Sequence, residues 1–314
     1  MKILVAGGAG YIGSRLVPAI IEKRHQVDVV DLLWFGNHLP EKVKIIKKDA
    51  FDCQEKDLSG YDQVIFLAGI SSDLMAEYSP VKNFIMNGAL PVYLAFIARK
   101  AGVKRFIYAS SCSVYGYAPD HLYTEDDPAK GDYPYGISKL QGEKGLRQLN
   151  NSDFSIITLR LGTVSGHSPR MRLDLIVNAM FKSAITTGKI KVINQEIWRP
   201  ICDIRDVVAA FSLAIEASEG VSGLFNICSD NFTVGQAAEI ISGSIEKLSG
   251  HKIVLDQQKI ADLRNFRVSI EKAKRELKFK PRYLINDIVD DLYSHKEYYG
   301  DFEKEEFYNA GLFK

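Results

Sequence analysis

A glycine-rich stretch near the N-terminus restricts the possible folds more than any other feature of the sequence. The short apolar segment Ile3–Ala6 runs directly into Gly7–Gly13, which reads Gly-Gly-Ala-Gly-Tyr-Ile-Gly. Glycine permits a sharp strand-to-helix turn at Gly7, close approach of a ligand to the backbone at Gly10, and tight packing of helix on strand at Gly13. This spacing predicts a βα unit whose helix N-terminus binds an anionic diphosphate.

The first half of the chain alternates short β-branched runs with longer amphipathic segments, such as Tyr11–Lys23 and Val81–Ala101. Such alternation predicts an α/β fold of the Rossmann type, with right-handed βαβ units and a doubly wound parallel sheet. The expected strands are Ile3–Ala6, Gln26–Asp31, Val43–Lys47, Gln63–Leu67, Arg105–Ala109 and Ser155–Leu161.

The alternation ends after Leu161, and we expect a loop over Gly162–Arg172 followed by a helix over Leu173–Thr187. A further helix over Asp203–Ala217 precedes a strand, Gly223–Cys228, that should rejoin the main sheet. We therefore predict a Rossmann domain of residues 1–165 plus about 203–230. Residues 166–202 and 231–314 are predicted to form a smaller mixed α/β domain that binds the substrate.

Composition excludes several classes of partner. The chain has 314 residues with 40 Lys+Arg and 39 Asp+Glu, so its net charge of +1 gives no reason to expect a nucleic acid. We expect no membrane span and no cleaved signal segment, and therefore a cytoplasmic protein. The four cysteines are Cys53, Cys112, Cys202 and Cys228. Their wide spacing predicts buried, reduced thiols and no metal site.

A carboxylate at the end of the second expected strand indicates the cofactor. Asp31 follows the glycine turn by about 20 residues, where an acid can accept hydrogen bonds from the adenosine ribose hydroxyls. The next residues are Leu32, Leu33 and Trp34, so no cation is placed to receive a 2′-phosphate. The pattern predicts NAD rather than NADP.

A tyrosine and a lysine provide a candidate proton-transfer pair. Tyr135 and Lys139 follow Pro134, which suits a first helical turn, and their spacing puts both side chains on one helix face. A nearby ammonium should lower the pKa of the phenol, whose ordinary value is near 10. Such a tyrosine can take a hydroxyl proton while hydride leaves the same carbon for nicotinamide. Ser111, just after a strand end, is placed to hold the substrate oxygen.

These residues together resemble the extended short-chain dehydrogenase/reductases, the sugar-nucleotide epimerase/dehydratase group, over most of the chain. The resemblance implies NAD binding, a nucleotide-diphosphate sugar as substrate, and catalysis by Ser111, Tyr135 and Lys139. The residues that it implies for the cofactor are Gly7, Gly10, Tyr11, Ile12, Gly13, Asp31, Asp49, Ala50, Ala68, Gly69, Asn87, Tyr135 and Lys139.

For the substrate, the resemblance implies Ser111, Asn178 near the phosphates, and Arg199 and Arg264 on the diphosphate, a role that suits guanidinium groups. The segment Ser168–Leu175 also looks like a subset of the family in bacterial surface-sugar pathways, including a GDP-heptose 4-dehydrogenase. Within it, Arg170 or Arg172 could reach the substrate or form a salt bridge inside the loop.

Two departures bear on the reaction. Cys112-Ser113 stands where the family's dehydratases carry Asp-Glu, which argues against elimination of water. Gly162-Thr163 differs from the Asn-containing stretch of common galactose-type epimerases, which leaves the sugar open. We expect oxidation at C4 leading to epimerisation. A net 4-dehydrogenase, a ketosugar reductase and a non-catalytic dinucleotide-binding protein are the alternatives. The resemblance also implies a homodimer formed through the Tyr135–Lys139 helix and the long helix before it.

Overall fold

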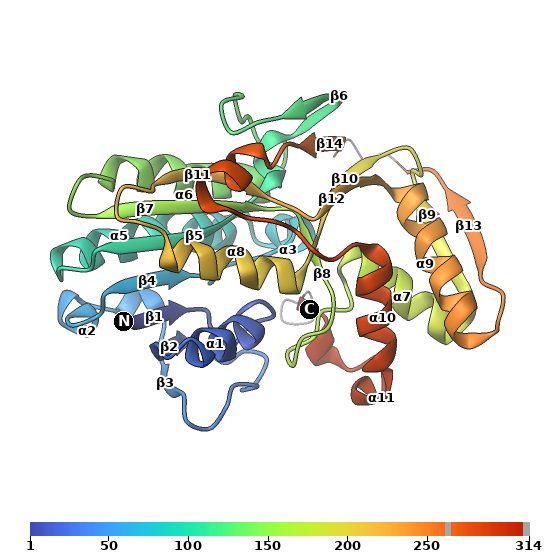
Figure 1. Ribbon diagram of the computed structural model, residues 1–314, viewed down its shortest axis with the longest axis horizontal. Coiled ribbons are helices and arrows are strands. Elements are labelled where there is room, and N and C mark those ends of the chain that lie inside the picture. Colours follow the sequence, from blue (N-terminus) through green and yellow to red (C-terminus); the bar gives the residue numbers. More distant parts are fainter. Residues whose placement is uncertain (261–264, 310–314) are drawn as a thin grey trace.

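The central feature of the fold is a parallel sheet of seven strands in the order β11-β7-β5-β4-β1-β2-β3 (Figure 1). The computed structural model describes residues 1–260 and 265–309, with backbone only for 117–119. The strands of this sheet are β1 (Lys2–Ala6), β2 (Gln26–Asp31), β3 (Lys44–Lys47), β4 (Gln63–Phe66), β5 (Arg105–Ser111), β7 (Ser155–Leu161) and β11 (Gly223–Ile227). The predicted Rossmann sheet is confirmed, and its last strand returns to pair with β7 as expected.

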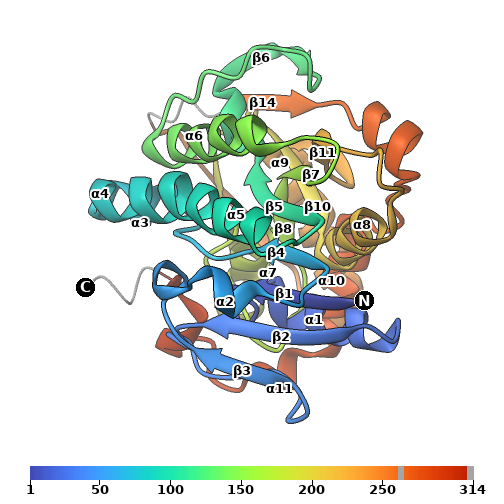
Figure 2. The ribbon, with the colours of Figure 1, turned by 90° about the vertical axis from the view of Figure 1, so that its left-hand side faces the viewer.

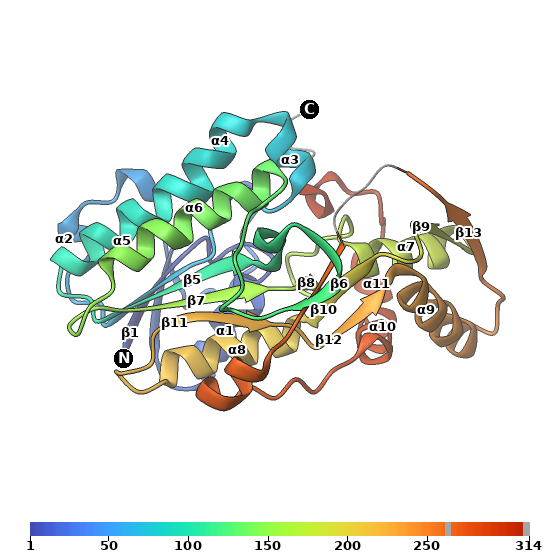
Figure 3. The same cartoon turned by 90° about the horizontal axis from the view of Figure 1, so that it is seen from above.

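Helices cover both faces of the sheet (Figures 2 and 3). The helices α2 (Glu55–Leu58), α5 (Leu90–Lys100) and α6 (Pro134–Leu149) lie on one face, and α1 (Gly13–Glu22) and α8 (Ile204–Glu216) lie on the other. Because side chains alternate along a strand, Ile3 and Val5 enter one core while Leu4 and Ala6 enter the other. Burial on both faces explains why these strands are apolar without interruption.

The sheet has its topological switch point between β1 and β4. The chain leaves β1 toward β2 and β3 and then crosses back to place β4 on the other side of β1. The connections after β1 and β4 therefore diverge, which opens a crevice at the carboxyl ends of these two strands. The glycine turn after β1 faces this crevice.

The expected long helix over Val81–Ala101 has an interruption. It consists of α4 (Pro80–Phe84), a π-helical turn over Ile85–Ala89, and α5. Pro91 has no N–H to donate to the carbonyl of Asn87, and the hydroxyl of Tyr108 on β5 donates to that carbonyl instead at 2.9 Å. The widened turn thus exchanges a helical hydrogen bond for a bond to the sheet.

The remaining elements build smaller sheets beside the carboxyl ends of the main strands. The strands β8 (Thr163–Ser165), β10 (Trp198–Asp203) and β12 (Asp230–Thr233) form one of them, β9 (Lys189–Ile193) pairs with β13 (Val254–Gln258), and β14 (Asn265–Val268) pairs with β6 (Tyr117–Tyr123). The helices there are α7 (Ile176–Thr187), α9 (Val234–Ser249), α10 (Ile285–Ser294) and α11 (Lys296–Tyr299), and α3 (Asp73–Tyr78) precedes α4.

Two expectations for this part need correction. The segment expected as a loop contains β8, because Thr163–Ser165 finds a parallel partner in β10, far along the chain. The helix expected from Leu173 begins only at Ile176. The N–H of Leu173 donates to the carbonyl of Phe307, so a tertiary contact delays the start of the helix.

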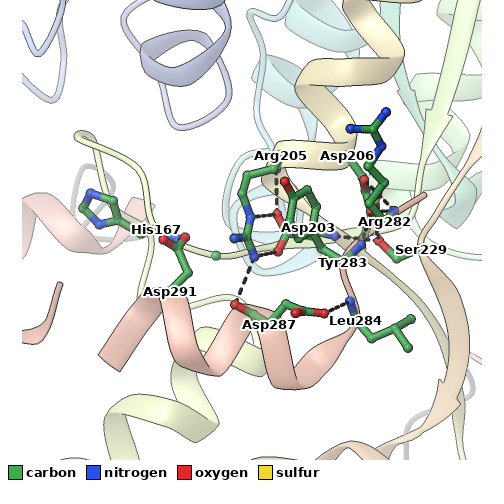
Figure 4. Close-up of polar contacts among 12 residues, drawn as sticks. His167, Asp203, Arg205, Asp206, Ser229, Arg282, Tyr283, Leu284, Asp287 and Asp291 are labelled. Atoms are coloured by element: carbon green, nitrogen blue, oxygen red, sulfur yellow. Dashed lines mark hydrogen bonds and ion pairs between the residues drawn. The ribbon is translucent and has the colours of Figure 1, made fainter. Parts of the chain in front are cut away.

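A polar network fastens α10 to the start of α8 (Figure 4). Buried Asp206 accepts hydrogen bonds from the Ser229 hydroxyl at 2.8 Å and from the backbone N–H groups of Arg282 and Tyr283. Beside it, Arg205 forms a bidentate ion pair with Asp203. Backbone N–H groups that lose a buried acceptor cost free energy, so Asp206 should contribute strongly to stability.

The segment Pro80–Lys100 is long and apolar enough to span a membrane, with a mean hydropathy of 1.3, contrary to our reading of the sequence. Half of it is buried inside the protein, as in the core helix of a globular fold. The four cysteines are free and buried, as predicted.

We predict that Asp206→Ala lowers the free energy of unfolding by about 2–4 kcal/mol, because three donors lose their acceptor. Asp206→Asn keeps one acceptor oxygen and should lose less. Urea denaturation followed by circular dichroism measures both, with Asp290→Ala at an exposed position of α10 as the control. Equal stability of Asp206→Ala and the control would contradict this role.

Candidate functional site

The turn between β1 and α1 is shaped by the absence of side chains. Gly7 has φ +79°, and a Cβ on it would overlap the backbone of Ala68 after β4. A Cβ on Gly13 would overlap the backbone of Gly8. A Cβ on Gly10 would come no closer than 3.5 Å to its nearest neighbour, the Gly7 carbonyl. Gly7 and Gly13 therefore serve the packing of the chain, whereas Gly10 leaves open space for a ligand.

A cavity at the switch point is lined by most of the residues predicted to bind the cofactor. Those lining it are Gly7, Gly10, Tyr11, Ile12, Gly13, Asp31, Asp49, Ala50, Ala68 and Gly69. Lining residues that the prediction did not assign to the cofactor include Trp34, Phe35, Lys48, Ser71, Met86, Leu90, Arg170, Arg172 and Asn309. A concave site with a helix N-terminus, an acid and apolar walls fits a dinucleotide.

Asp31 is held at the end of β2 by the backbone. One carboxylate oxygen accepts the N–H of Ala9 at 2.9 Å, and the other accepts the N–H of Leu33 at 2.8 Å. Each oxygen has a second lone pair that can accept a ribose hydroxyl. The first bond also ties the glycine turn to β2, so Asp31 both shapes the turn and faces the cavity.

Asn87 does not line the cavity but supports its wall. Its amide donates to the carbonyl of Ile70 at 2.8 Å and to the hydroxyl of Ser138 at 3.3 Å. Its Oδ1 occupies the space that a Cβ on Gly69 would need. Asn87 therefore connects the loop after β4 to α6, and a direct contact with the cofactor stays a prediction.

The candidate catalytic residues come together where α6 approaches the end of β5. A Cβ on Gly136 would overlap the carbonyl of Ser113, so only glycine allows this approach. It places the phenol of Tyr135 close enough to Ser111, the last residue of β5, for the serine hydroxyl to favour the phenolate. The structure thus brings Ser111 and Tyr135 together as the sequence predicted.

The pKa of Tyr135 differs from expectation. Burial and then the charge of Asp73 raise it to about 12, while the hydrogen bond with Ser111 and the charge of Arg172 act in the lowering direction. The prediction that Lys139 lowers the pKa of Tyr135 below its ordinary value is therefore wrong for the protein by itself. Removing the phenol from water outweighs the nearby cations.

Lys139 explains part of this result. It is 5% exposed, and its Nζ donates to the carbonyl of Ala109 at 2.9 Å and lies 5.9 Å from the centre of the Tyr135 ring. Burial lowers the pKa of Lys139 to about 7, against a partial opposing effect of Glu143. Near neutral pH the lysine is therefore only partly charged, and it has less influence on the phenol than a full ammonium.

A buried ion pair anchors α6, the helix that carries Tyr135 and Lys139, to the sheet. Glu143, one turn after Lys139, forms a bidentate pair with Arg160 of β7, with a shortest distance of 2.6 Å. Both side chains are 3% exposed. Glu143 also accepts the Ser110 hydroxyl, and Arg160 donates to the hydroxyl of Tyr115. These bonds satisfy both charges and hold α6 in register with β5 and β7.

The three further residues predicted to bind the substrate, Asn178, Arg199 and Arg264, lie in different parts of the chain. Asn178 is fully buried and contacts Gly166, Arg172 and Tyr11, so its amide holds a loop in place. Arg199 lies half-buried on β10 and donates to the carbonyl of Trp198. Arg264 lies outside the described residues. A substrate contact stays a prediction for all three.

The segment Ser168–Leu175 contributes more to the cavity than the sequence indicated. Arg172 forms the loop salt bridge that we considered, with Asp174 at 2.6 Å, and also donates to Ser71. Among the residues that the structure describes, Arg170 forms no such bridge, and it reaches Asn309 near the C-terminus. No local pattern could reveal this contact, because 139 residues separate the two partners.

We predict a pH-dependent stability difference between the wild type and Lys139→Met. The unfolded lysine keeps its ordinary pKa, so between about pH 7 and pH 10.5 the unfolded wild type binds more protons than the folded one, and its stability rises with pH. The variant lacks this gain. At low pH the folded wild type carries a buried charge that the variant lacks, so the variant should have the higher urea midpoint. This difference in midpoint should be largest near pH 6.5 and shrink toward pH 9.5. A difference independent of pH would contradict the lowered pKa.

Comparisons with known proteins agree with this geometry. Residues 3–228 match the NAD dependent epimerase/dehydratase family. The chain is 26% identical to a UDP-glucose 4-epimerase of Corynebacterium glutamicum, covering 96% of this chain and 97% of that protein. It is 28% identical to a UDP-glucose 4-epimerase of Streptococcus mutans, covering 90% and 92%.

Solved structures show the same fold. The UDP-glucose 4-epimerase of Thermotoga maritima with UDP-glucose superposes with a TM-score of 0.84 at 25% identity, over 96% of this chain and 100% of that one. MoeE5 in complex with UDP-glucose and NAD gives a TM-score of 0.84 at 24% identity, with the same coverage. With the family model matched from β1 to the end of β11, the chain belongs to the NAD-dependent epimerase/dehydratase family.

Proposed function

We propose that this protein is an NAD-dependent epimerase that inverts C4 of a nucleotide-diphosphate sugar. The observation that carries the proposal is the placement of Tyr135 next to Ser111 and under the influence of Arg172, which lines the cavity suited to a dinucleotide. Relatives along most of the chain are named UDP-glucose 4-epimerases, which supports the same reaction here. A UDP-hexose is therefore the first substrate to test.

The chain's own residues would divide the work as follows. When bound, NAD supplies a reversible hydride acceptor. Ser111 would hold the C4 oxygen beside the phenol of Tyr135, which would take up and return the hydroxyl proton. A positively charged group near the phenol lowers the pKa of Tyr135 from its raised value. A bound ligand that carries positive charge and a charged Lys139 would therefore both favour the phenolate, the form that acts as the base.

The position after Ser111 supports epimerisation over elimination. Cys112 is 1% exposed, its thiol donates to the carbonyl of Arg160, and burial raises its pKa well above the ordinary value. It offers no acid to a substrate. A dehydratase needs a group that protonates a leaving hydroxyl, and this position cannot supply one.

We further propose the division into domains stated for the sequence, with residues 166–202 and 231–314 binding the sugar nucleotide. The small sheets and α7, α9 and α10 gather at the carboxyl ends of the main strands, where a substrate would meet the cofactor (Figure 1). Asn178, Arg199 and Arg264 remain our candidates for the diphosphate. We also propose a cytoplasmic location.

We predict that the wild type converts a UDP-hexose to its C4 epimer without net NADH. Tyr135→Phe should keep NAD binding, because the ring stays, and should lower kcat by at least about 100-fold, because the proton acceptor is lost. Proton NMR of the sugar and absorbance at the NADH band follow both products, and calorimetry measures NAD binding.

Other outcomes identify the alternatives. Stoichiometric NADH with a 4-keto product and no inverted sugar would show a net dehydrogenase. NAD binding without turnover of UDP-glucose, UDP-glucuronic acid, UDP-N-acetylglucosamine, or the GDP-, CDP- and dTDP-sugars would show a non-catalytic binder. Near-native activity of Tyr135→Phe would contradict the role of the phenol.

We propose a two-fold homodimer through the face that carries α4, α5 and α6 (Figure 3). On the long helical stretch before α6, Leu90, Leu94 and Ile97 are buried in the core, and Ile85 is exposed. Phe96 and Val81 are exposed on the same helical stretch, at 46% and 70%. Several large apolar side chains exposed along one helical stretch are typical of an interface.

We predict that light scattering reports twice the chain mass at micromolar concentration, and that the double variant Val81→Glu, Phe96→Glu is monomeric because burying two carboxylates at an interface is costly. Leu248→Glu, at an exposed site on α9, is the matched control and should remain dimeric. A monomeric wild type would refute the assembly.

A further inference from the structure

Arg170 is the largest fully buried side chain in the described part of the protein. It is 2% exposed and lines the cavity at the switch point. One NH2 group donates to the Oδ1 of Asn309, and the guanidinium stacks on Phe35, 3.7 Å from the ring centre. Its Nε is buried and has no hydrogen-bond partner.

The charge of Arg170 has no ion-pair partner among the carboxylates that the structure describes. Within residues 1–260 and 265–309, the ion pairs of this region join Arg172 to Asp174, and none includes Arg170. Burial and then the neighbouring charge of Arg172 lower the pKa of Arg170 to about 9. At neutral pH the protein therefore buries a cation that Arg172 repels and that the charges of Asp174 and Asp31 offset only in part, which costs stability.

The backbone of Arg170 is fixed at the start of α1. Its N–H donates to the hydroxyl of Ser14 in the first turn of that helix, and the neighbouring Ser168 bonds both Ser14 and the carbonyl of Tyr11. From this anchor the side chain extends to Phe35, which follows β2. It therefore passes along the cavity wall between the helix N-terminus and the Asp31 side.

We propose that Arg170 is a ligand of the cofactor's diphosphate and completes the anion site that the glycine turn begins. Gly10 leaves open space at the helix N-terminus, and the guanidinium adds donors where an anion would lie. The unpartnered Nε and a fixed planar fork suit a phosphate oxygen. A bound diphosphate would supply the counter-charge that the protein lacks. This inference rests on the NAD site proposed above.

The C-terminal segment positions this arginine. Asn309 accepts from Arg170 and donates to the hydroxyl of Ser71, in the loop after β4. The preceding residues are tied down because the carbonyl of Phe307 accepts the N–H of Leu173. Asn309 thus joins Arg170 to the loop after β4 and acts as a positioning residue for the guanidinium.

Calorimetry of the full chain with NAD, ADP and adenosine tests the proposal. Arg170→Met should weaken NAD and ADP by about 10- to 100-fold, the usual range for a charge-assisted hydrogen bond, and leave adenosine unchanged because it carries no phosphate. Asn309→Ala should weaken NAD by a smaller factor, since the cation remains. Arg282→Met, at an exposed position, is the control.

Thermal unfolding without added ligand separates a ligand role from a structural one. Removing an uncompensated buried cation should leave the melting temperature of Arg170→Met equal to or above that of the wild type, while the shift produced by NAD becomes smaller. A lower melting temperature of Arg170→Met with unchanged NAD and ADP affinity would overturn the proposal. Weakened binding of NADP alone would also overturn it, because that result would place Arg170 at a 2′-phosphate. A wild type that binds no NAD would instead contradict the proposed function.

Discussion

The close approach of two backbones, at Gly7 after β1 and Ala68 after β4, sets the geometry of the rest of the site. A side chain at Gly7 would overlap Ala68, so the two strand ends meet only because this position is glycine. From that contact the chain turns into α1, whose N-terminus then faces the crevice at the switch point. Asp31 secures the turn by accepting the N–H of Ala9. The dinucleotide pocket is thus a consequence of backbone packing before any side chain contributes.

The candidate catalytic residues depend on a second set of constraints that joins α6 to the sheet. Gly136 lets the helix start close to Ser113, and the Glu143–Arg160 pair holds its middle against β7. Asn87 connects the same helix to the loop that lines the cavity. Proton transfer requires short and stable distances between the reacting groups. These three contacts supply them by joining α6 to three different parts of the fold.

Burial produces the unusual electrostatics of the site. The pKa of Tyr135 is raised and the pKa values of Lys139 and Arg170 are lowered, each mainly because the charged form has lost water. A cavity with such groups is prepared for a ligand that brings charge of its own. The arrangement costs stability in the protein alone, and ligand binding would recover it.

Local sequence patterns were sufficient for the Rossmann sheet, the glycine turn, Asp31 and the Ser111–Tyr135 pair, because each depends on spacing within one βα unit or one helix turn, or on strand ends that meet at one sheet edge. The interrupted helix around Pro91, the short strand β8 and the delayed start of α7 required partners far along the chain. The same holds for Arg170, whose partner is Asn309, and for the raised pKa of Tyr135. Sequence by itself determined which chemistry is present, through residue type and spacing. Tertiary structure alone decided which charges are buried, because burial depends on how distant segments pack.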